Sequence, residues 1–540
     1  MNTKEFYEYI KTFDLGYYEI GKNGVWLKVP TEYDADGIAV KFKTTRVCSI
    51  PIAPTALYEN VDSGCEKIEI SYLKKSRWRS IIVDREKVAN NQQIIKLAND
   101  GIEVSSDNSK QLVSYFSNFV SNNLSKIPYK LSRCSLGWYG DDFVPYTGDI
   151  TFDGAEEFRA IIRAIRPSGS LEEWEKHVAQ LRKNKQMRLM IDVSFASPLI
   201  EKAGENPFMF HCWGTTSFGK TVALMTAMSI WGDPSMGALT KTLNMTPNAM
   251  LAQAGCLYNL PFAGDELQTI KNKCDSFDTL IMTLTEGIDR QRLNQNSSLK
   301  DTKSWRCAFI TTGEETCVKQ GSGGGTKNRV IEMECKNKLV ENGNFTAEFV
   351  KNNYGTAGRE YIELLKDINI KEMYRKKFNE ILSTVETSDK QAGAAALILV
   401  ADELVYDHFF AEEEPLTVED ISPYLLSMDD ISAPERAYSY VCDVISENAV
   451  RFDADNNGSV WGVLDGDEVY INKTVLRRIL NEQSFDLDAC RREWIRNGYL
   501  KRNMGNNLRW WKTIKGVKTD CYRLLLSKEN EQIEFEDLPF

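Results

Sequence analysis

His211-Cys212-Trp213-Gly214-Thr215-Thr216-Ser217-Phe218-Gly219-Lys220-Thr221 is the stretch that decides the fold of this 540-residue sequence. From Gly214 to Thr221 it matches the phosphate-loop pattern G-x-x-x-x-G-K-[ST] at every position. The apolar run Phe208-Met209-Phe210 precedes it, and Val222-Ala223-Leu224-Met225 follows it. We therefore predict a strand, the loop and a helix, in that order.

In this geometry the glycines let backbone N–H groups close around phosphates at a helix N-terminus, where the macrodipole favours negative charge. Lys220 is expected to reach the β- and γ-phosphates of ATP, and Thr221 to hold Mg²⁺ through its hydroxyl. The alternative is a chance glycine loop beside a lysine, which the complete match in the right context disfavours. The residues expected to contact the nucleotide are Gly214, Thr215, Thr216, Ser217, Phe218, Gly219, Lys220 and Thr221.

Length and composition indicate a multidomain globular protein. A chain of 540 residues exceeds a single core and suggests three or four units. No run approaches the roughly 18 apolar residues of a membrane span, and the first residues do not resemble a signal peptide, so we expect a cytoplasmic protein without a membrane partner. The 12 Cys contain no C-x-x-C pair and there are only 3 His, which indicates neither a zinc site nor a disulfide framework.

The charge is unevenly distributed. The whole chain carries a net charge of −11, but residues 471–525 contain 13 Lys+Arg against 5 Asp+Glu. A basic C-terminal region on an acidic body is compatible with nucleic acid as a partner of that region.

Residues 1–166 are expected to form an α+β domain. Residues 67–72 and 79–83 alternate like strands, and residues 111–124 have a helical pattern. Asp34-Ala35-Asp36 resembles paired metal-binding acids, but Gly37 follows it, and we favour a solvated turn. A second cluster fits a nucleic-acid backbone and a solvated strand end equally well. It consists of Lys74, Lys75, Arg77, Trp78 and Arg79.

ATP hydrolysis requires an acid that holds the metal and a group that orients the attacking water. Leu260–Glu266 is an apolar strand that ends in two acids, about 45 residues after Lys220. Asp265 suits the Walker B role on Mg²⁺, and Glu266 suits polarisation of water. The second acid favours an ATP hydrolase over a small-molecule kinase.

Further strands and helices complete the expected core. We predict strands at residues 240–245, 308–312 and 330–333 and helices from Pro247 and over residues 277–284. Thr312, at the end of its strand, could sense the γ-phosphate. The Gly-rich stretch 321–326 is expected to be a mobile loop that presents Arg329, either as an arginine finger for the nucleotide of a neighbouring subunit or as an ordinary strand-end arginine. His211 and Cys212 are expected to be packing residues.

This order of motifs predicts an α/β fold, the AAA+/RecA-like additional-strand P-loop ATPase core, with its nucleotide at the C-terminal edge of a parallel sheet. At this point the chain resembles a family: the self-loading, MCM-like replicative helicases of staphylococcal mobile elements, which comprise the Cch proteins of the cassette chromosome and the Rep initiators of the pathogenicity islands, within a wider family of phage and mobile-element ATPases. The resemblance rests on Trp78-Arg79, Gly137-Trp138, Gly214–Thr221, Leu260–Glu266, Thr312-Gly313-Glu314, Asn328-Arg329-Val330 and Tyr354–Gly358.

The resemblance implies roles that the residues alone do not establish. Thr312 would be sensor 1, Arg329 the trans-acting finger, and Lys390 the sensor 2 cation, although a lysine does not reproduce the fork of an arginine. A pre-sensor hairpin would occupy residues 290–303 and grip DNA in the pore of a ring, whereas without the resemblance a solvated loop is the better interpretation. Its candidate DNA contacts are Arg290, Arg292, Lys300 and Lys303.

Residues 411–435 are acidic and contain prolines, so we predict a linker or a loosely packed connection after an ATPase domain at 167–410. Residues 436–540 have the order of a winged helix, with helices at 436–449, 473–481 and 486–497 before strands near 499–501 and 522–525. Asp453–Gly458 begins like a calcium loop but lacks the required Glu, and we expect a turn. The last residues, 529–540, are expected to fray. The expected DNA contacts are Arg492 and Arg496 on the third helix and Arg509, Lys512, Lys515 and Lys518 on the wing.

The motifs predict an ATP- and Mg²⁺-dependent hydrolase with a DNA-binding module, and the resemblance implies a DNA helicase that initiates replication of a mobile genetic element. The resemblance implies a homo-oligomer, expected to be a hexameric ring, acting on origin, single-stranded and forked DNA in the cytoplasm of a bacterial host. The alternative is a DNA-binding regulator that uses ATP as an assembly switch without unwinding, and a small-molecule P-loop kinase is disfavoured.

Overall fold

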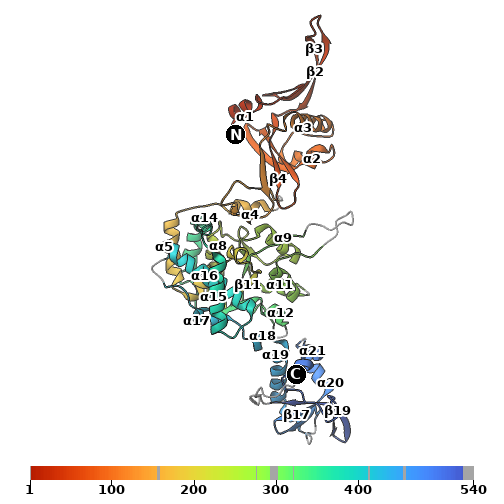
Figure 1. Cartoon of the computed structure of the whole chain (residues 1–540), viewed down its shortest axis with the longest axis vertical. Helices are drawn as coiled ribbons and strands as arrows, with labels where there is room; N and C mark the ends of the chain where they lie inside the picture. Colours follow the sequence, from red (N-terminus) through yellow and green to blue (C-terminus); the bar gives the residue numbers. More distant parts are fainter. Residues whose placement is uncertain are drawn as a thin grey trace, which may run out of the picture. The chain divides into compact units, whose positions relative to one another are not determined.

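The computed structural model divides the chain into two units, which we describe separately (Figure 1). The first unit comprises residues 1–163 with 255–258 and 291–301, and the second comprises 164–254, 259–290 and 302–540. The structure describes residues 2–154, 158–274, 276–291, 302–319, 322–410, 414–453, 456, 458–483 and 485–526.

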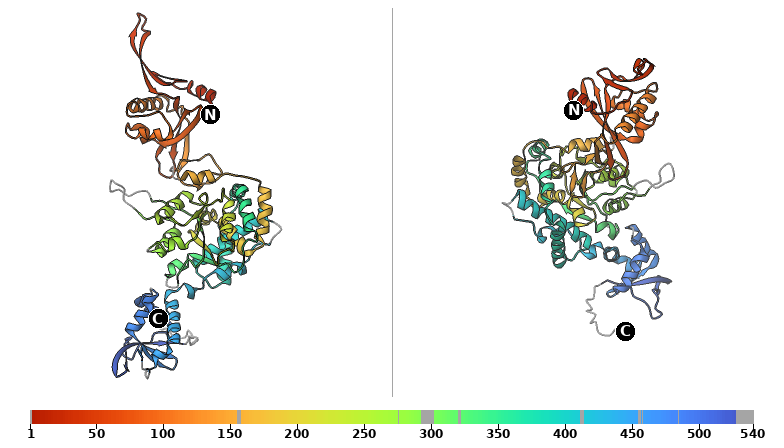
Figure 2. Two further views of the ribbon diagram at one scale, coloured as in Figure 1. Left: turned by 180° about the vertical axis from the view of Figure 1, so that it is seen from behind. Right: turned by 45° about the horizontal axis from the view of Figure 1, so that its top comes forward.

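The first unit contains a three-stranded antiparallel sheet with a long hairpin. Helix α1 (Thr3–Ile10), capped by Asn2, precedes strands β1 (Tyr18–Gly21), β2 (Gly24–Tyr33) and β3 (Ala39–Cys48). The β2–β3 hairpin projects from the rest of its unit in Figure 1 and in the left view of Figure 2. At its tip the Asp34 N–H donates to the carbonyl of Ile38 (2.9 Å) and Gly37 has φ +76°. The turn predicted for Asp34–Asp36 is confirmed.

A five-stranded sheet in the order β10-β7-β4-β5-β6 holds the core of this unit. Helix α3 (Ser109–Asn123) buries Leu112, Tyr115 and Phe119 in that core, which confirms the α+β prediction. The remaining elements are β4 (Ile52–Asn60), β5 (Glu66–Lys74), β6 (Arg77–Asp84), α2 (Arg85–Ala89), η1 (Ile94–Asp100), β7 (Tyr129–Arg133), β8 (Gly137–Tyr139), β9 (Asp142–Val144) and β10 (Thr151–Phe152).

The basic cluster near Trp78 lies at the β5–β6 hairpin. Lys75 and Ser76 both have positive φ, as a type I′ turn requires. The ring of Trp78 stacks on Phe6 with centroids 4.0 Å apart, and its Nε1–H donates to Thr3 Oγ1 (3.1 Å). Trp78 therefore has a structural role, packing against α1. Contact of the neighbouring cations with nucleic acid stays a prediction.

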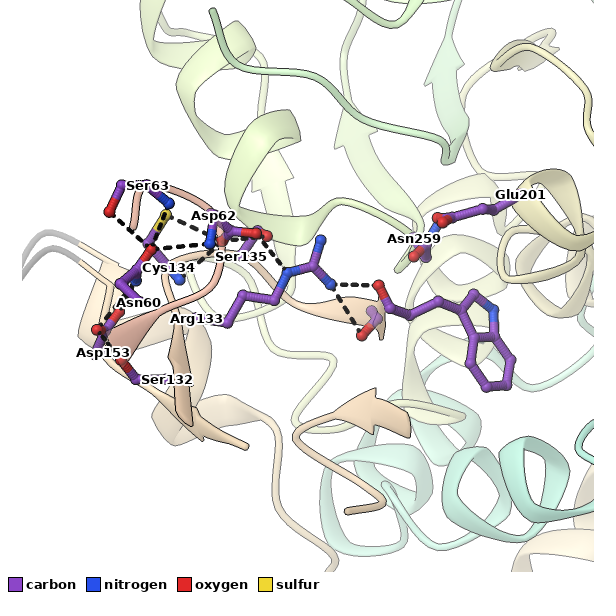
Figure 3. Close-up of polar contacts among 12 residues, drawn as sticks. Asn60, Asp62, Ser63, Ser132, Arg133, Cys134, Ser135, Asp153, Glu201 and Asn259 are labelled. Atoms are coloured by element: carbon purple, nitrogen blue, oxygen red, sulfur yellow. Dashed lines mark hydrogen bonds and ion pairs between the residues drawn. The ribbon is translucent and has the colours of Figure 1, made fainter. Parts of the chain in front are cut away.

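A polar network surrounds Arg133 at the end of β7 (Figure 3). Its Nε donates to Asp62 Oδ1 (2.8 Å), and its Nη1 donates to the carbonyls of Gly137 and Trp138. The second carboxylate oxygen of Asp62 accepts from the Ser135 hydroxyl (3.0 Å). The Gly137-Trp138 pair is thus held by its carbonyls, and buried Trp138 packs edge-on against Phe143.

The second unit is built on a five-stranded, wholly parallel sheet in the order β12-β13-β14-β11-β15. Strand β14 lies between the strand that precedes the phosphate loop and the strand that carries the two acids, which is the additional-strand arrangement predicted from the sequence. The bounds are β11 (Phe208–Trp213), β12 (Thr240–Thr242), β13 (Phe262–Asp265), β14 (Ala308–Gly313) and β15 (Val330–Glu334).

Helices enclose this sheet. Helix α16 (Asp389–Phe409) is apolar from Ala392 to Ala401, and it buries an unbroken run from Gln391 to Asp402. The other helices of this unit before it are α5 (Leu171–Arg182), α6 (Lys185–Ala196), α7 (Leu199–Ala203), α8 (Lys220–Ser229), α9 (Pro247–Leu257), α10 (Gln268–Lys271), α11 (Phe277–Glu286), α12 (Gly324–Lys327), α13 (Gly343–Asn352), α14 (Ala357–Leu364) and α15 (Ile370–Thr384), and α4 (Arg159–Ala164) spans the boundary between the two units. Among the described residues, no helix combines the length and apolar character that a membrane crossing requires.

Buried charges link three of these helices. The Arg188 guanidinium forms two hydrogen bonds with the carboxylate of Asp402 (2.6 and 2.9 Å), and Arg182 Nη2 donates to the same group (2.8 Å). The carboxylate also accepts from the Leu416 N–H (2.6 Å). Burial alone would raise the pKa of Asp402, but the two guanidinium groups outweigh it and hold the pKa below its usual value.

Asp402→Ala is expected to lower the free energy of unfolding of this unit by about 3–5 kcal/mol, because it leaves two buried guanidinium groups with a single carboxylate, that of Asp192. The measurement is urea unfolding, followed through the transition that an ATP analogue shifts. Asp407→Ala, at an exposed position of the same helix, is the matched control and should change stability by less than about 0.5 kcal/mol. Equal midpoints for the two variants would contradict the role assigned to Asp402.

The segment predicted as a linker is packed. Leu416, Val418 and Ile421 are buried, and the segment forms α17 (Val418–Ile421), η3 (Ser422–Tyr424) and α18 (Met428–Ile431). The loose connection predicted here is therefore wrong for the described part, because alternating apolar residues anchor an otherwise acidic stretch. Residues 411–413 lie outside the described part, and the domain boundaries stay predictions.

The C-terminal module, residues 433–526, is a winged helix with one more hairpin than predicted. Its elements are α19 (Ala433–Glu447), η4 (Ala449–Phe452), β16 (Gly462–Asp465), β17 (Glu468–Asn472), α20 (Lys473–Glu482), α21 (Leu487–Arg496), β18 (Trp510–Ile514) and β19 (Val517–Leu525). The four strands form one sheet in the order β16-β17-β19-β18, and the predicted strand near residue 500 is a single bridge from Leu500 to Leu524. Residues 454, 455 and 457 of the calcium-like stretch and 529–540 of the tail lie outside the described residues.

Candidate nucleotide site

The phosphate loop follows β11 and leads into α8, as predicted. Gly214, Ser217 and Gly219 have φ of +148°, +74° and +83°, so the backbone turns repeatedly through conformations that favour glycine. A Cβ on Gly214 would stand 3.0 Å from the carbonyl oxygen of Cys335. The first glycine of the motif is therefore required both by its conformation and by the segment packed behind it.

Lys220 closes the loop on itself. Its ammonium donates to the carbonyls of Gly214 and Thr215, both at 2.8 Å. Thr215, Thr216 and Ser217 are exposed, while Phe218 and Gly219 are half-buried. The loop is thus preformed, and a bound phosphate would replace the carbonyl oxygens as the partner of the ammonium.

Three oxygen-bearing side chains meet beside the loop. The Thr221 hydroxyl donates to Asp265 Oδ2 (2.9 Å), and the hydroxyl of buried Thr312 donates to Asp265 Oδ1. The parallel register of β13 and β14 places these groups together at the carboxyl edge of the sheet. A hydroxyl and a carboxylate fit Mg²⁺, which takes few protein oxygens and completes its shell with phosphate and water.

Glu266 follows Asp265 in a strained conformation. It has φ +60°, an uncommon value for a residue with a side chain, and it is exposed. Its N–H donates to Asp265 Oδ1 (3.2 Å). The backbone thereby turns the second acid away from the strand, into a position open to solvent and to a ligand.

One acid at this edge was missed by the sequence reasoning. Glu314, two residues after Thr312, accepts a hydrogen bond from the Thr216 hydroxyl through Oε1 (2.8 Å). It thus contacts the phosphate loop across the end of β14. The only sequence signal was its place directly after the polar end of that strand.

Arg329 lies at the opposite edge of the sheet. Its carbonyl accepts from the Met209 N–H (3.1 Å), so it stands beside the start of β11, whereas the phosphate loop begins after the end of that strand. Gly214 follows Met209 by five residue steps along the strand, which corresponds to roughly 16 Å. Within one chain, Arg329 and the phosphate loop therefore occupy different ends of the sheet.

Lys390 lies beside Arg329. The neighbouring Gln391 side chain donates to the Val330 carbonyl (2.8 Å), which fixes the start of α16 at the same edge. Burial, and then the nearby charge of Arg329, lower the pKa of Lys390. Arg329 Nη2 is 3.7 Å from Glu286, an acid that the sequence reasoning did not select. The two candidate cations thus form one group with Glu286, away from the phosphate loop of their own chain.

The Gly-rich stretch before Arg329 differs from the mobile loop predicted. Gly324–Lys327 form the short helix α12, and a Cβ on Gly324 would stand 2.6 Å from the carbonyl oxygen of Ile431. Arg329 is mostly buried, with 14% of its side chain exposed, and it donates to the Gly325 carbonyl. Gly324 therefore permits close packing. The prediction that a mobile loop presents Arg329 is wrong for the described residues. Gly321 lies outside the described residues.

The predicted DNA-gripping hairpin has an ordered base. The Asp289 N–H donates to the Lys303 carbonyl (2.9 Å), and the Trp305 N–H donates to the Gly287 carbonyl (2.9 Å). The base carries the candidate cations Arg290 and Lys303. The other two candidates, Arg292 and Lys300, lie outside the described residues.

In the C-terminal module, α21 buries Leu487, Cys490 and Trp494 on one face, as predicted. Arg492 and Arg496 are exposed, and Arg496 pairs with Glu493 of its own helix. On the wing, Arg509 lies 3.4 Å from Asp520, and the Lys512 ammonium lies 3.8 Å from the centroid of Tyr470. Lys518 stands over Trp511, and Lys515 donates to the Gly458 carbonyl.

His211 is enclosed directly below the loop. Nδ1 lies 2.9 Å from the Thr311 hydroxyl, and Nε2 lies 2.9 Å from the Glu315 carbonyl. Burial lowers the pKa of His211 to about 4. Cys212 is buried beside Cys335, with sulfurs 3.0 Å apart. Both residues have the packing role predicted for them.

Acidification should destabilise this unit through His211. The imidazole is neutral in the folded protein but titrates near its ordinary pKa in the unfolded chain. The unfolded chain therefore binds a proton first as the pH falls, and the free energy of unfolding decreases from about pH 6.5 down toward pH 4. At pH 5.5 the loss is about 1.4 kcal/mol. His211→Gln should reduce the difference between melting temperatures at pH 7.5 and 5.5, whereas His408→Gln, at an exposed position, should leave it unchanged. Equal pH dependence in all three proteins would contradict this assignment.

Comparison with known proteins agrees with this architecture. A solved structure described as "SCCmec type IV Cch - active helicase" is 17% identical, covers 95% of this chain and 98% of its own, and superposes with a TM-score of 0.69, which shows a shared fold. A second, "The A form apo structure of NrS-1 C terminal region-CTR", is 12% identical over 88% of this chain and 96% of its own, with a TM-score of 0.32. No curated protein matches the chain.

Two family models match the sequence. The Cch helix turn helix domain matches residues 432–529, which cover the C-terminal module. The resemblance to the Cch proteins predicted from the sequence is thereby confirmed. The model described as Domain of unknown function (DUF927) matches residues 18–304, more than half of the chain. The chain therefore belongs to the DUF927 family.

Proposed function

We propose that the chain is an ATP-dependent DNA helicase that unwinds DNA at the origin of a mobile genetic element in the cytoplasm of a bacterial host. It works as a ring of identical subunits, expected to be hexameric, with each ATP held between two of them. The superposing Cch structure is that of an active helicase, and it supports this proposal because the two proteins share their fold along nearly their whole lengths.

The opposite positions of the phosphate loop and Arg329 are the observation that carries the proposal. The loop, Asp265, Glu266 and Thr312 gather at the carboxyl edge, while Arg329 and Lys390 gather at the amino edge. A head-to-tail interface brings opposite ends of neighbouring subunits together and closes into a ring. In such a ring the two cations contact the nucleotide of the neighbour.

Within each site the side chains divide the work. Lys220 moves from the loop carbonyls to the phosphates, and Thr312 contacts the γ-phosphate from the end of its strand. Thr221 and Asp265 would hold Mg²⁺, which neutralises charge on the phosphates when it is bound. Glu266 polarises the attacking water, and Arg329 of the neighbouring subunit stabilises the charge that develops on the transferred group.

DNA contacts come from two regions of the chain. The base of the 290–303 hairpin carries Arg290 and Lys303, which would face phosphates in the pore of the ring. The C-terminal module is expected to bind duplex at the origin through exposed cations, as winged helices do. Both contacts are electrostatic and should weaken with salt.

Strand displacement on forked DNA with ATP and Mg²⁺ tests this function. The parental chain should release the labelled strand, and Lys220→Ala should not. Slow hydrolysis with no displacement at any protein concentration would instead favour the ATP-switched regulator. A phosphorylated small-molecule product would favour a kinase.

A further inference from the structure

The wing of the C-terminal module presents an exposed tryptophan at a fixed position. Strands β18 and β19 are joined by Lys515-Gly516, both with positive φ (+49° and +74°), which is the two-residue turn whose twist suits a hairpin. Because such a turn fixes the register, Trp511 stands opposite Asp520, and Thr513 stands opposite Lys518.

The two faces of this ribbon differ. On one face Trp510 packs against Tyr470 with centroids 5.9 Å apart, and the Arg523 guanidinium lies 4.7 Å from the Trp510 centroid. Because side chains alternate along a strand, Trp511 points to the other face, where half of its side chain (51%) is exposed. Its indole is therefore a rigid, flat apolar surface open to a ligand.

Two cations and one acid, Asp520, flank that surface. The Lys518 ammonium lies 5.1 Å from the Trp511 centroid, and Arg509 is 63% exposed. Residues 509–520 contain four cations and one acid, Asp520, whereas α21 contains three arginines and two acids. In α21, Arg491 lies 3.1 Å from Asp488, and Arg496 pairs with Glu493. On the wing, Arg509 lies 3.4 Å from Asp520, the acid opposite Trp511, and Lys512 lies 3.5 Å from Asp465. With these pairs counted, the wing still has the larger excess of cations over acids.

We propose that the wing holds an unpaired base of DNA by stacking it on Trp511, with Lys518 and Arg509 on the flanking phosphates. This rests on the proposed DNA-binding function and adds its substrate class: single-stranded DNA beside a duplex, as at a fork. An aromatic face with adjacent cations is the combination that binds single strands. A base still within a duplex would first have to be unstacked, which costs a few kcal/mol, whereas an unpaired base requires no such step.

The test measures binding of the full chain to labelled forked, single-stranded and blunt duplex DNA of one sequence, by fluorescence anisotropy over a series of salt concentrations. Trp511→Ala should weaken binding to forked and single-stranded DNA by about 5- to 150-fold with an unchanged salt slope, because stacking releases no counterions. Binding to blunt duplex should change less than about 2-fold. Trp511→Phe should restore most of the affinity.

Lys518→Gln separates charge from stacking. It should make the salt slope on single strands less negative by about 0.7, as the loss of one phosphate contact does. Leu464→Ala, an exposed apolar position on the first hairpin of the same module, is the matched control and should leave all affinities unchanged. An unchanged thermal unfolding profile for Trp511→Ala would show that the variant folds.

Two results would overturn the proposal. Unchanged binding of Trp511→Ala to forked DNA would remove Trp511 from the interface, and an equal loss on blunt duplex would mean that the wing contacts paired DNA. Failure of the parental chain to bind any DNA would instead contradict the proposed function itself.

Discussion

Glu266→Gln should reduce ATP turnover by about 10²- to 10⁴-fold while leaving the affinity for ATP within about 3-fold of the parental value. The amide has the size of the carboxylate but cannot accept the proton of the attacking water. Glu266 makes no phosphate contact in this assignment, so binding is preserved. Steady-state phosphate release and binding of a fluorescent ATP analogue measure the two effects separately.

Two further variants make this test specific. Glu341→Gln, an exposed acid shortly before α13, should leave turnover unchanged. Asp265→Asn should also lose turnover, but with weakened Mg²⁺-dependent binding, because Asp265 pairs with Thr221 where the metal would be held. Hydrolysis by Glu266→Gln at the parental rate would show that another group orients the water, and Glu314 would be the next candidate because it contacts Thr216.

Arg329→Ala and Lys220→Ala should each be nearly inactive alone and should recover activity when mixed. Loss of an arginine finger costs about 10³- to 10⁵-fold. In a random equal mixture, about one interface in four joins an intact phosphate loop to an intact Arg329, so about a quarter of the parental rate should return. The rate of ATP hydrolysis against mixing ratio is the measurement.

The matched control is the double variant Lys220→Ala/Arg329→Ala mixed with Arg329→Ala, a pair that cannot assemble a complete site. Lys390→Ala should complement Lys220→Ala as Arg329→Ala does, since Lys390 lies beside Arg329 at the start of α16. If mixed rings form but regain no activity, Arg329 does not act on the neighbouring nucleotide.

The sequence was most informative where function depends on a short continuous motif. The phosphate loop needs glycines at positions with positive φ, and the strands on either side are apolar, so Gly214–Thr221 could be placed without a structure. Asp265 and Thr312 could be assigned to the same edge because parallel strands end together. Their shared hydrogen bonds, with Asp265 between two hydroxyls, required coordinates.

Composition gave the wrong prediction for two segments, one rich in glycine and one rich in acids, because tertiary packing decides their conformation. The stretch before Arg329 has the composition of a loop, but its glycines allow a helical turn to approach the backbone at Ile431. Residues 414–435 have the composition of a linker, yet Leu416 and Ile421 are buried. In both cases local preference was overridden by contacts with residues far along the chain.

The extra hairpin of the C-terminal module could have been predicted from its turn residues. Gly466-Asp467 joins β16 to β17, and Gly466 has φ +64°, as expected for a two-residue hairpin turn. The position of Arg329 had no such signal. It depends on the register of β11 with β15, which only the assembled sheet defines.

Under the proposed function, that register makes ATP consumption depend on protein concentration. Because a strand's length separates the loop of each chain from its own Arg329, an isolated copy would lack a complete site under the proposed function, whatever the ATP concentration. The specific hydrolysis rate should therefore rise with protein concentration and fall on dilution. Under the proposed function, accumulation of the protein would act as the timing signal, since hydrolysis would begin only when enough copies are present to assemble.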